Sequence, residues 1–499
     1  MTSILFCSAE VAPFSKTGGL GDLANALPTA LSTLVDDICV VTPAYRGAAE
    51  RGLMPARKIA RLQVDGFDQS IDILETRLGT TGVTCYLVDA GTLFDRAGGP
   101  YQDLDGRDYA DNPLRFAVFC RAIVEIAMGR CDLGFRPDIL HLNDWQTGLV
   151  PLLLRLEKSP PPSLFVVHNL QYQGVYSHAA YQQLKLPDDC FTPDGVEFHG
   201  NFSFIKSGLV YAERLVTVSP SYAEEIKTPA YGCGLDGLLR HRAEDLLGII
   251  NGIDSDTWNP ATDPLIERCF DATSIDDKRF NKVALQTEFG LEARPSAMVA
   301  AHIGRLATQK GADLIIDAAQ AMCADKDVQL VILGAGDHEI AASLTSLSAS
   351  SRGAIAFREA FDERLAHRIE AGADLLLMPS RYEPCGLNQL YSMRYGTVPL
   401  VRRTGGLKDT VRCQAENDAT GFCFDEFSRD ALVDAWRDAV GVFRDEPARW
   451  RSLIRAGMSQ DFSWRQSAIR YCDLYDELLG NVPGQTDSLS KAGMHEICP

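Results

Sequence analysis

The segment K-T-G-G-L-G-D at residues 16–22 recurs as R-T-G-G-L-K-D at residues 403–409. Each copy follows an apolar run typical of a β-strand and precedes a run with helical periodicity. Glycines let the backbone approach an anion closely, and the first amides of a helix point toward it with the positive end of the helix dipole. A single Gly-Gly pair is more often only a turn between a strand and a helix. Two copies in the same setting, far apart in the chain, favour two domains that close on one anionic ligand.

The composition is that of an ordinary globular protein. Its 499 residues are 46% hydrophobic and 23% charged, which is enough for two or three domains with full cores. With 48 Lys and Arg against 67 Asp and Glu, the net charge is −19, which repels polyanions over most of the surface. We therefore expect neither nucleic acid nor an anionic membrane as a partner. A phosphate-bearing ligand would be held by a few local cations and backbone amides.

The fourteen cysteines do not form a recognisable disulfide framework. They are scattered singly, no two are closer in sequence than Cys413 and Cys423, and no C-x-x-C or zinc spacing occurs. Residues 1–9 read directly as a strand rather than as an export signal. No apolar run approaches the roughly 20 residues that span a bilayer. We expect a protein of the reducing cytoplasm.

Short apolar, β-branched runs alternate with longer helical stretches, which is typical of parallel sheets wrapped by helices. In such doubly wound α/β folds, ligands bind at the carboxyl ends of the strands. The predicted strands of the first series are residues 3–8, 38–42, 83–88, 138–142, 164–167, 215–218 and 247–250. Those of the second series are residues 298–303, 329–333, 355–357, 374–378 and 398–401.

A polar stretch rich in Pro and Asp, residues 254–274, separates the two series. We therefore predict two Rossmann-like domains, at residues 1–250 and 251–465. A terminal helix at 466–482 is expected to pack back on the first domain, and residues 483–499 are expected to form a mobile tail.

The second domain carries the densest chemistry. Arg305 and Lys310 lie between a predicted strand and a predicted helix, a placement that suits a diphosphate, although isolated cations are more often solvated surface charges. Glu383 follows another strand and precedes the helix that opens near Gly386. A carboxylate in this place can simply cap the helix. The same geometry can direct Glu383 toward a sugar while the helix amides receive phosphates.

Together these motifs resemble those of the bacterial glycogen synthases and plant starch synthases. That family consists of retaining glucosyltransferases of the GT-B fold, in which two Rossmann-like domains face a central cleft. The shared motifs run through almost the whole chain in the family's order. They are K-T-G-G-L-G-D at 16–22, H-x-N-D-W-Q-T-G at 141–148, V-H-N at 167–169, N-G-I-D at 251–254, G-R-L-x-x-Q-K-G at 304–311, E-P-C-G-L-N-Q-L-Y at 383–391 and R-R-T-G-G-L at 402–407.

The resemblance implies a nucleotide-sugar site supplied by both domains. Cations of the two domains border the donor diphosphate, a histidine contacts the donor glucose, and the E-P-C-G glutamate contacts the sugar hydroxyls. The residues matching these catalytic positions are Lys16, His168, Arg305, Lys310 and Glu383. Those matching other donor contacts are Gly18, Gly19, Asp22, Tyr101, Asp144, Asn169, Asn251, Phe361, Cys385, Gly386, Leu387, Thr404 and Gly405.

One position departs from the family pattern. Phe361 stands where many members have a tyrosine on or near the adenine ring. Phenylalanine keeps the stacking face and loses the hydroxyl group, so we expect base stacking to persist.

The implied reaction transfers glucose from ADP-glucose to the non-reducing end of an α-1,4-glucan with retention of configuration. The resemblance implies front-face attack without an enzyme nucleophile, so Glu383 is assigned to sugar positioning and charge stabilisation. No metal or prosthetic group is expected, because arginine and lysine stabilise the departing phosphate. Two alternatives stay open: another retaining GT-B transferase with a UDP-glucose donor or a small acceptor, and a catalytically silent glucan-binding paralogue. The motifs carry no information on oligomeric state.

Overall fold

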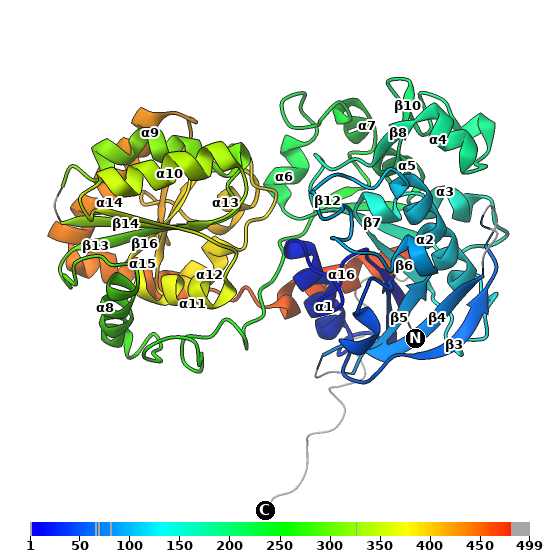
Figure 1. The fold of residues 1–499 in the computed structure, drawn as a ribbon, viewed down its shortest axis with the longest axis horizontal. Helices are drawn as coiled ribbons and strands as arrows, with labels where there is room; N and C mark the ends of the chain where they lie inside the picture. Colours follow the sequence, from blue (N-terminus) through cyan, green and yellow to red (C-terminus); the bar gives the residue numbers. More distant parts are fainter. Residues whose placement is uncertain (1, 65–66, 68–69, 80–81, 326, 481–499) are drawn as a thin grey trace, which may run out of the picture. The chain divides into compact units, whose positions relative to one another are not determined.

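The computed structural model describes residues 2–64, 67, 70–79, 82–325 and 327–480, and the tail predicted at 483–499 lies outside these residues. The chain forms two compact units (Figure 1). Unit 1 contains the described residues of Met1–Thr217, Ile226–Gly252 and Trp464–Pro499, and unit 2 contains those of Val218–Glu225 and Ile253–Ser463.

Within the described residues, unit 1 is built on a nine-stranded sheet with the order β12-β11-β7-β6-β1-β2-β5-β4-β3. Neighbouring strands are parallel from β12 to β5, whereas β4 is antiparallel to both β5 and β3. The strands are β1 (Ser3–Cys7), β2 (Asp37–Pro43), β3 (Arg57–Leu62), β4 (Ile71–Arg77), β5 (Thr84–Asp89), β6 (Ile139–Asn143), β7 (Ser163–Val167), β11 (Arg214–Thr217) and β12 (Leu246–Gly248). A small antiparallel sheet contains β8 (Val175–Ser177), β9 (Glu197–Phe198) and β10 (Asn201–Ser203).

Helices pack around the large and the small sheet of unit 1. They are α1 (Gly19–Leu31), α2 (Asn112–Ala127), α3 (Val150–Arg155), α4 (His178–Gln183), α5 (Phe204–Tyr211), α7 (Asp236–His241) and α16 (Trp464–Leu478). The first helix, α1, packs against the last, α16, and both bury apolar side chains in one core with β1 and β2. The Tyr475 hydroxyl lies 2.7 Å from Nδ1 of the buried His141 in β6, which ties α16 to the centre of the sheet. Helix α16 begins before residue 466 and ends before residue 482, so both of its ends lie earlier in the chain than predicted.

Unit 2 has, among its described residues, a six-stranded parallel sheet with the order β15-β14-β13-β16-β17-β18. Its strands are β13 (Met298–Ile303), β14 (Val328–Gly334), β15 (Ile355–Glu359), β16 (Leu375–Met378), β17 (Val398–Arg402) and β18 (Phe422–Phe424). Alternate strand residues enter two different cores. Helices lie on both faces of the sheet, which makes it doubly wound (Figure 1). One core includes α9 (Ala312–Met322), α10 (His338–Ser350), α14 (Arg429–Asp445) and α15 (Pro447–Met458); the other includes α8 (Lys278–Glu288), α11 (Glu363–Gly372), α12 (Asn388–Arg394) and α13 (Gly405–Thr410).

The structure corrects the predicted domain boundaries at one internal segment. Residues 218–225, predicted within the first domain, belong to unit 2. They contain α6 (Pro220–Glu225), which packs against α13. The Ser219 hydroxyl donates to the Pro384 carbonyl, and the Ser221 amide and hydroxyl donate to the Asp409 carboxylate at 2.7 and 2.6 Å. These contacts hold α6 to unit 2, although its sequence neighbours lie in unit 1. The chain also crosses between units after Gly252 and again after residue 463.

The cysteine spacing predicted no disulfide framework, yet the two cysteines closest in sequence are paired. Cys413 and Cys423 form a disulfide that closes the segment between α13 and β18. Backbone hydrogen bonds from Thr420 and Gly421 to the Arg412 carbonyl already fold this segment back on itself, which brings the two thiols together. Eleven other cysteines in the described residues form no disulfide. Among the helices of the described residues, none is both long and apolar enough to cross a membrane.

Candidate active site

Many of the predicted site residues lie where the order of the strands reverses in each sheet. In unit 1 the first strand, β1, lies between β2 and β6; in unit 2 the first strand, β13, lies between β14 and β16. Lys16 and Asp144 follow β1 and β6, and Lys310 and Glu383 follow β13 and β16. The carboxyl ends of the strands beside such a switch point form the usual binding crevice of an open α/β sheet.

The first glycine loop opens a helix as predicted from the sequence. Gly18 is extended, α1 begins at Gly19, and no side chain caps this helix end. A Cβ atom added to Gly18 would meet no atom within 4 Å, so the backbone is open to an approaching ligand here. Lys16 Nζ lies 2.8 Å from Asp22 Oδ1, in an ion pair that spans the loop. These four predicted residues therefore form one compact group at the start of α1.

Asp144 and His168 are linked directly. The Asp144 carboxylate accepts a hydrogen bond of 2.8 Å from the His168 amide. Asp144 lies at the end of β6, and its backbone has a left-handed φ of 56°. Burial raises the Asp144 pKa to about 7, although amides of residues 168 and 169 lower it. His168 Nε2 lies 2.9 Å from the Asn143 side-chain oxygen. Burial lowers the His168 pKa to about 3, so this imidazole is neutral at physiological pH.

Tyr101 lies beneath the first glycine loop. Its hydroxyl donates to Glu10 Oε1 at 2.7 Å and accepts from Gln146 Nε2 at 2.8 Å. Burial and the neighbouring carboxylate raise the Tyr101 pKa well above its ordinary value. Tyr101 is a predicted site residue, whereas its partners Glu10 and Gln146 were not predicted. Gln146 stood inside a quoted motif, and a carboxylate just after an apolar strand was a signal for Glu10.

In unit 2 the predicted cations and the predicted glutamate follow adjacent strands, β13 and β16. Lys310 Nζ is 2.6 Å from Glu383 Oε2, and the Ser380 hydroxyl donates to the same oxygen at 3.1 Å. Glu383 is only 4% exposed, whereas Arg305 is exposed. Glu383 and Lys310 are thus in direct contact, and the exposed Arg305 donates from its guanidinium to Gln309 Oε1 at 3.4 Å.

The second glycine loop packs closely on the segment that carries Glu383. Gly405 has a φ of +44°, and a Cβ atom there would lie 2.1 Å from the Glu383 carbonyl oxygen. Thr404 Oγ1 and the Gly405 amide both donate to Glu225 Oε1. This loop does face an anion, and in the structure that anion is a side chain of α6.

The remaining predicted positions lie around these groups. Cys385 is buried, Gly386 has a φ of +73°, and Leu387 precedes α12. Phe361 is 80% exposed just beyond edge strand β15, as an unobstructed aromatic face.

Two asparagines differ in their surroundings. Asn169 accepts a hydrogen bond from the Gln171 amide directly after His168. Asn251 follows the edge strand β12 and does not join the group at β1 and β6; its buried side-chain oxygen has no hydrogen-bond partner.

Within the part of the chain that the structure describes, no three or more His, Cys, Asp or Glu side chains are arranged to hold a metal ion.

Known families match each half of the chain. The family described as the starch synthase catalytic domain matches residues 3–241, and glycosyl transferases group 1 matches residues 288–442. Glycogen synthase from Thioalkalivibrio sulfidiphilus is 46% identical over 482 residues, covering 95% of this chain and 99% of that protein. Glycogen synthase from Aromatoleum aromaticum is 47% identical over 478 residues, covering 95% and 96%.

Solved structures of glycosyl-transferring enzymes share the fold of this chain. The catalytic domain of starch synthase IV from Arabidopsis thaliana, bound to ADP and acarbose, superimposes with a TM-score of 0.84 at 29% identity and covers 96% of this chain and 99% of that one. Sucrose-phosphate synthase from Thermosynechococcus elongatus superimposes with a TM-score of 0.60 at 18% identity, over 97% of this chain and 100% of that one, and shares the fold alone.

Proposed function

Because the chain belongs to the family of bacterial glycogen synthases and starch synthases, and is a hexosyltransferase of the GT-B fold, we propose that it transfers glucose from ADP-glucose to the non-reducing end of an α-1,4-glucan. The observation that supports this reaction is the placement of Lys16 and Asp144 in unit 1, and of Lys310 and Glu383 in unit 2, at the switch point of each sheet. Each switch point thus supplies one cation and one carboxylate.

The cations provide the charge that the leaving group needs. As the glycosidic bond breaks, negative charge grows on the diphosphate and positive charge on the sugar ring. We assign Arg305, Lys310, Lys16 and the open amides at the start of α1 to the diphosphate, because they are cations or helix-end donors at the carboxyl ends of strands. On this assignment a bound metal is not required.

Glu383 serves the sugar rather than attacking it. Its Oε2 atom is already engaged by Lys310 and Ser380, and an ion-paired carboxylate is a weak nucleophile. We assign it to hold the donor glucose and to stabilise positive charge on the ring. On this assignment Lys310 forms an ion pair with Glu383 and also binds the donor diphosphate. Neutral His168 is suited to a hydrogen bond with a glucose hydroxyl, because it carries no charge that would oppose the developing cation.

The relatives support the proposed acceptor and compartment. The matched starch synthase IV structure is described as bound to ADP and to acarbose. We propose glycogen as the acceptor and the cytoplasm as the site of the reaction. Phe361 is proposed as the platform for the adenine ring, since its exposed face is free to stack.

The test is incorporation of labelled glucose into glycogen by the purified protein, with ADP-glucose and UDP-glucose supplied separately in the presence of EDTA. We expect faster transfer from ADP-glucose, unchanged by the chelator. Preference for UDP-glucose would overturn the donor, and loss of activity with EDTA would overturn the metal-free assignment. Absence of transfer from either donor would favour a small acceptor or a silent glucan-binding protein.

A further inference from the structure

Glu10 is a buried carboxylate directly below the first glycine loop, and the roles assigned above do not include it. It follows β1 and is 4% exposed. Its Oε2 atom accepts the Thr17 amide at 2.5 Å, and its Oε1 atom accepts the Thr17 hydroxyl at 2.7 Å. Thr17 itself is exposed and lies between Lys16 and Gly18. A buried carboxylate thus fixes both the backbone and the side chain of one exposed loop residue.

The second glycine loop is held in a related way. Glu225 Oε1 accepts the Thr404 hydroxyl at 2.9 Å and the Gly405 amide at 2.8 Å. In both copies of the T-G-G-L sequence, a glutamate outside the motif therefore binds the threonine hydroxyl and one backbone amide. Charge-assisted hydrogen bonds of this kind are short and strongly directional. Because these contacts occur in both copies, the glutamate helps to fix the conformation of each loop.

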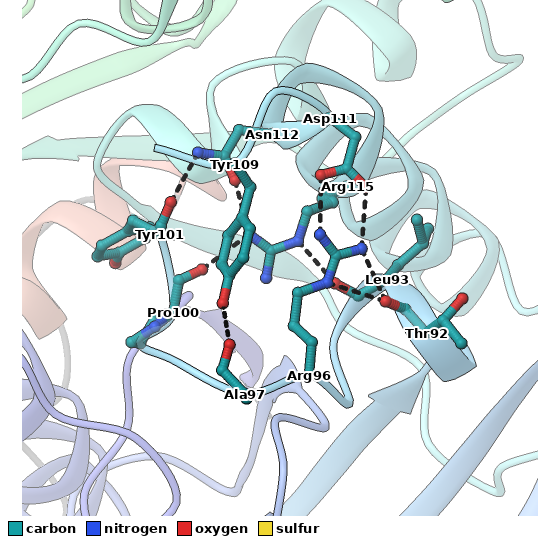
Figure 2. A network of polar contacts seen from close by, with 10 residues as sticks. All are labelled: Thr92, Leu93, Arg96, Ala97, Pro100, Tyr101, Tyr109, Asp111, Asn112 and Arg115. Carbon is teal, nitrogen blue, oxygen red and sulfur yellow. Dashed lines mark hydrogen bonds and ion pairs between the residues drawn. The ribbon is translucent and has the colours of Figure 1, made fainter. Parts of the chain in front are cut away.

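Glu10 is itself held from a third direction by Tyr101, whose hydroxyl donates to Oε1 at 2.7 Å. The backbone near Tyr101 is fixed by a network around Arg115 of α2, which is 0% exposed (Figure 2). Arg115 donates to the Leu93 and Pro100 carbonyls and to the Asn112 side-chain oxygen. Asn112 in turn donates to the Tyr101 carbonyl at 3.0 Å (Figure 2).

These contacts form a continuous path from the core of unit 1 to the loop that carries Lys16. Arg115 orders the segment containing Tyr101, Tyr101 orients the Glu10 carboxylate, and Glu10 holds Thr17. Because Lys16 and Gly18 are the chain neighbours of Thr17, small movements of Thr17 displace both. Misplacement of a binding group by about 1 Å can cost a hundredfold in rate.

We propose that Glu10 is a positioning residue of the donor site, which acts through Thr17 to set the Lys16 ammonium and the first amides of α1 against the donor diphosphate. This inference rests on the proposed function, since it concerns how the same nucleotide sugar is held. Glu10 does not touch the reacting atoms in this role.

The experiment measures ADP affinity by titration calorimetry, together with kcat and KM for ADP-glucose, in four variants. Glu10→Gln keeps the size of the side chain, but its amide nitrogen cannot accept a hydrogen bond, so one donor loses its acceptor. Thr17→Val removes only the hydroxyl. Lys16→Ala removes the cation, and Glu10→Gln/Lys16→Ala combines the two changes.

A matched control exists in the same unit. Glu213 Oε2 accepts the amide and the hydroxyl of Ser163, at 2.7 and 2.8 Å. Ser163 is the first residue of β7, so this contact lies at the amino ends of the strands, whereas the site lies at their carboxyl ends. Glu213→Gln therefore removes the same kind of contact without affecting the glycine loop, and its ADP affinity should stay within about twofold of the unmodified protein.

We expect Glu10→Gln to weaken ADP binding by about tenfold and Thr17→Val to weaken it in the same direction. In the Lys16→Ala background, Glu10→Gln should weaken ADP binding by clearly less than about tenfold, because the part of its effect that acts through Lys16 is already lost and only the part that acts through the first amides of α1 remains. Affinity within twofold of the unmodified protein in Glu10→Gln would overturn the inference, as would independent, multiplying effects of the two changes. An effect of Glu10→Gln with none from Thr17→Val would still support the inference, because valine keeps the Thr17 amide that donates to Glu10 Oε2.

Folding and function are separated by two further readings. If thermal unfolding shows that Glu10→Gln does not fold, Tyr101→Phe replaces it, because it removes one hydroxyl anchor of Glu10 and should weaken ADP binding; unchanged affinity in that variant would overturn the inference. If the unmodified protein neither binds ADP nor transfers glucose, the proposed function fails and the inference fails with it. If the unmodified protein binds ADP and the Glu10 variant binds it equally well, only the inference fails.

Discussion

Replacing Lys310 by methionine should destabilise the protein as well as inactivate it. The ammonium lies 2.6 Å from Glu383 Oε2, and Glu383 is 4% exposed, so its loss leaves a buried carboxylate without its cation. Breaking a fully buried ion pair costs about 3–5 kcal/mol. The Lys310 side chain is 23% exposed and Ser380 still donates to Glu383, so we expect about 2 kcal/mol. For a domain of this size that corresponds to a fall in Tm of about 6 °C.

A second substitution, Glu383→Gln, removes the carboxylate charge that Lys310→Met leaves buried. Glu383→Gln in the Lys310→Met background should recover most of the lost Tm, because a neutral amide is less costly to bury than a carboxylate. Turnover should behave differently. Each single variant should lose about a hundredfold or more in kcat, the scale of a charged transition-state contact, and the double variant should not regain it.

Calorimetry of the four proteins, with glucose transfer measured on the same samples, tests this reasoning. Arg381→Met is a suitable control, since Arg381 also pairs with a carboxylate in unit 2, Asp313, but both side chains are substantially exposed. The control should change Tm by about 1 °C or less. If Lys310→Met melts like the unmodified protein, or if the double variant melts no higher than Lys310→Met, the carboxylate does not depend on Lys310 for its burial.

Three further outcomes are expected. Arg305→Ala should weaken ADP-glucose binding about tenfold with an unchanged Tm, because Arg305 is exposed; normal kinetics would return Arg305 to the solvated surface. Asp144→Asn should flatten the pH dependence of stability: the folded pKa of about 7 lies above the ordinary value, so the stability linked to Asp144 is complete below about pH 4 and is lost as the pH rises through 7. Urea unfolding at pH 5 and pH 8 should therefore show a smaller loss in the variant by about 2 kcal/mol, and equal losses would contradict the raised pKa. Phe361→Ala should raise KM for ADP-glucose about tenfold, whereas Phe361→Tyr should keep it near normal; equal kinetics in all three proteins would remove the stacking role.

Local sequence patterns predicted the parallel cores of both sheets. Runs such as residues 298–303 and 398–401 are short, apolar and β-branched, and the corresponding strands β13 and β17 are buried on both faces. The antiparallel strands β3 and β4 escaped prediction. Strand β3 mixes charged and apolar residues without strict alternation and lies at the edge of the sheet, so its pairing with β4 depends on tertiary contacts.

Much of the candidate site was also predictable from the chain. The glycine loops, His168, Lys310 and Glu383 stand next to strands and helix starts, where short-range geometry already limits what they can do. Their family order identified the fold class and the transferase reaction. The domain boundaries and the disulfide were less accessible, because residues 218–225 join unit 2 through side-chain contacts with residues more than 160 positions away.

The sequence by itself thus determined the strand–helix alternation, the two anion-facing loops and the family, because periodicity and turn chemistry act over a few residues. Only the tertiary structure decided which groups hold those loops in place. Glu10 and Tyr101 are 91 positions apart, and Glu225 and Gly405 are 180 apart. No local preference encodes such pairs. They arise because parallel strands bring their carboxyl ends to one edge of a sheet, where buried carboxylates must find donors from whichever segments the topology delivers.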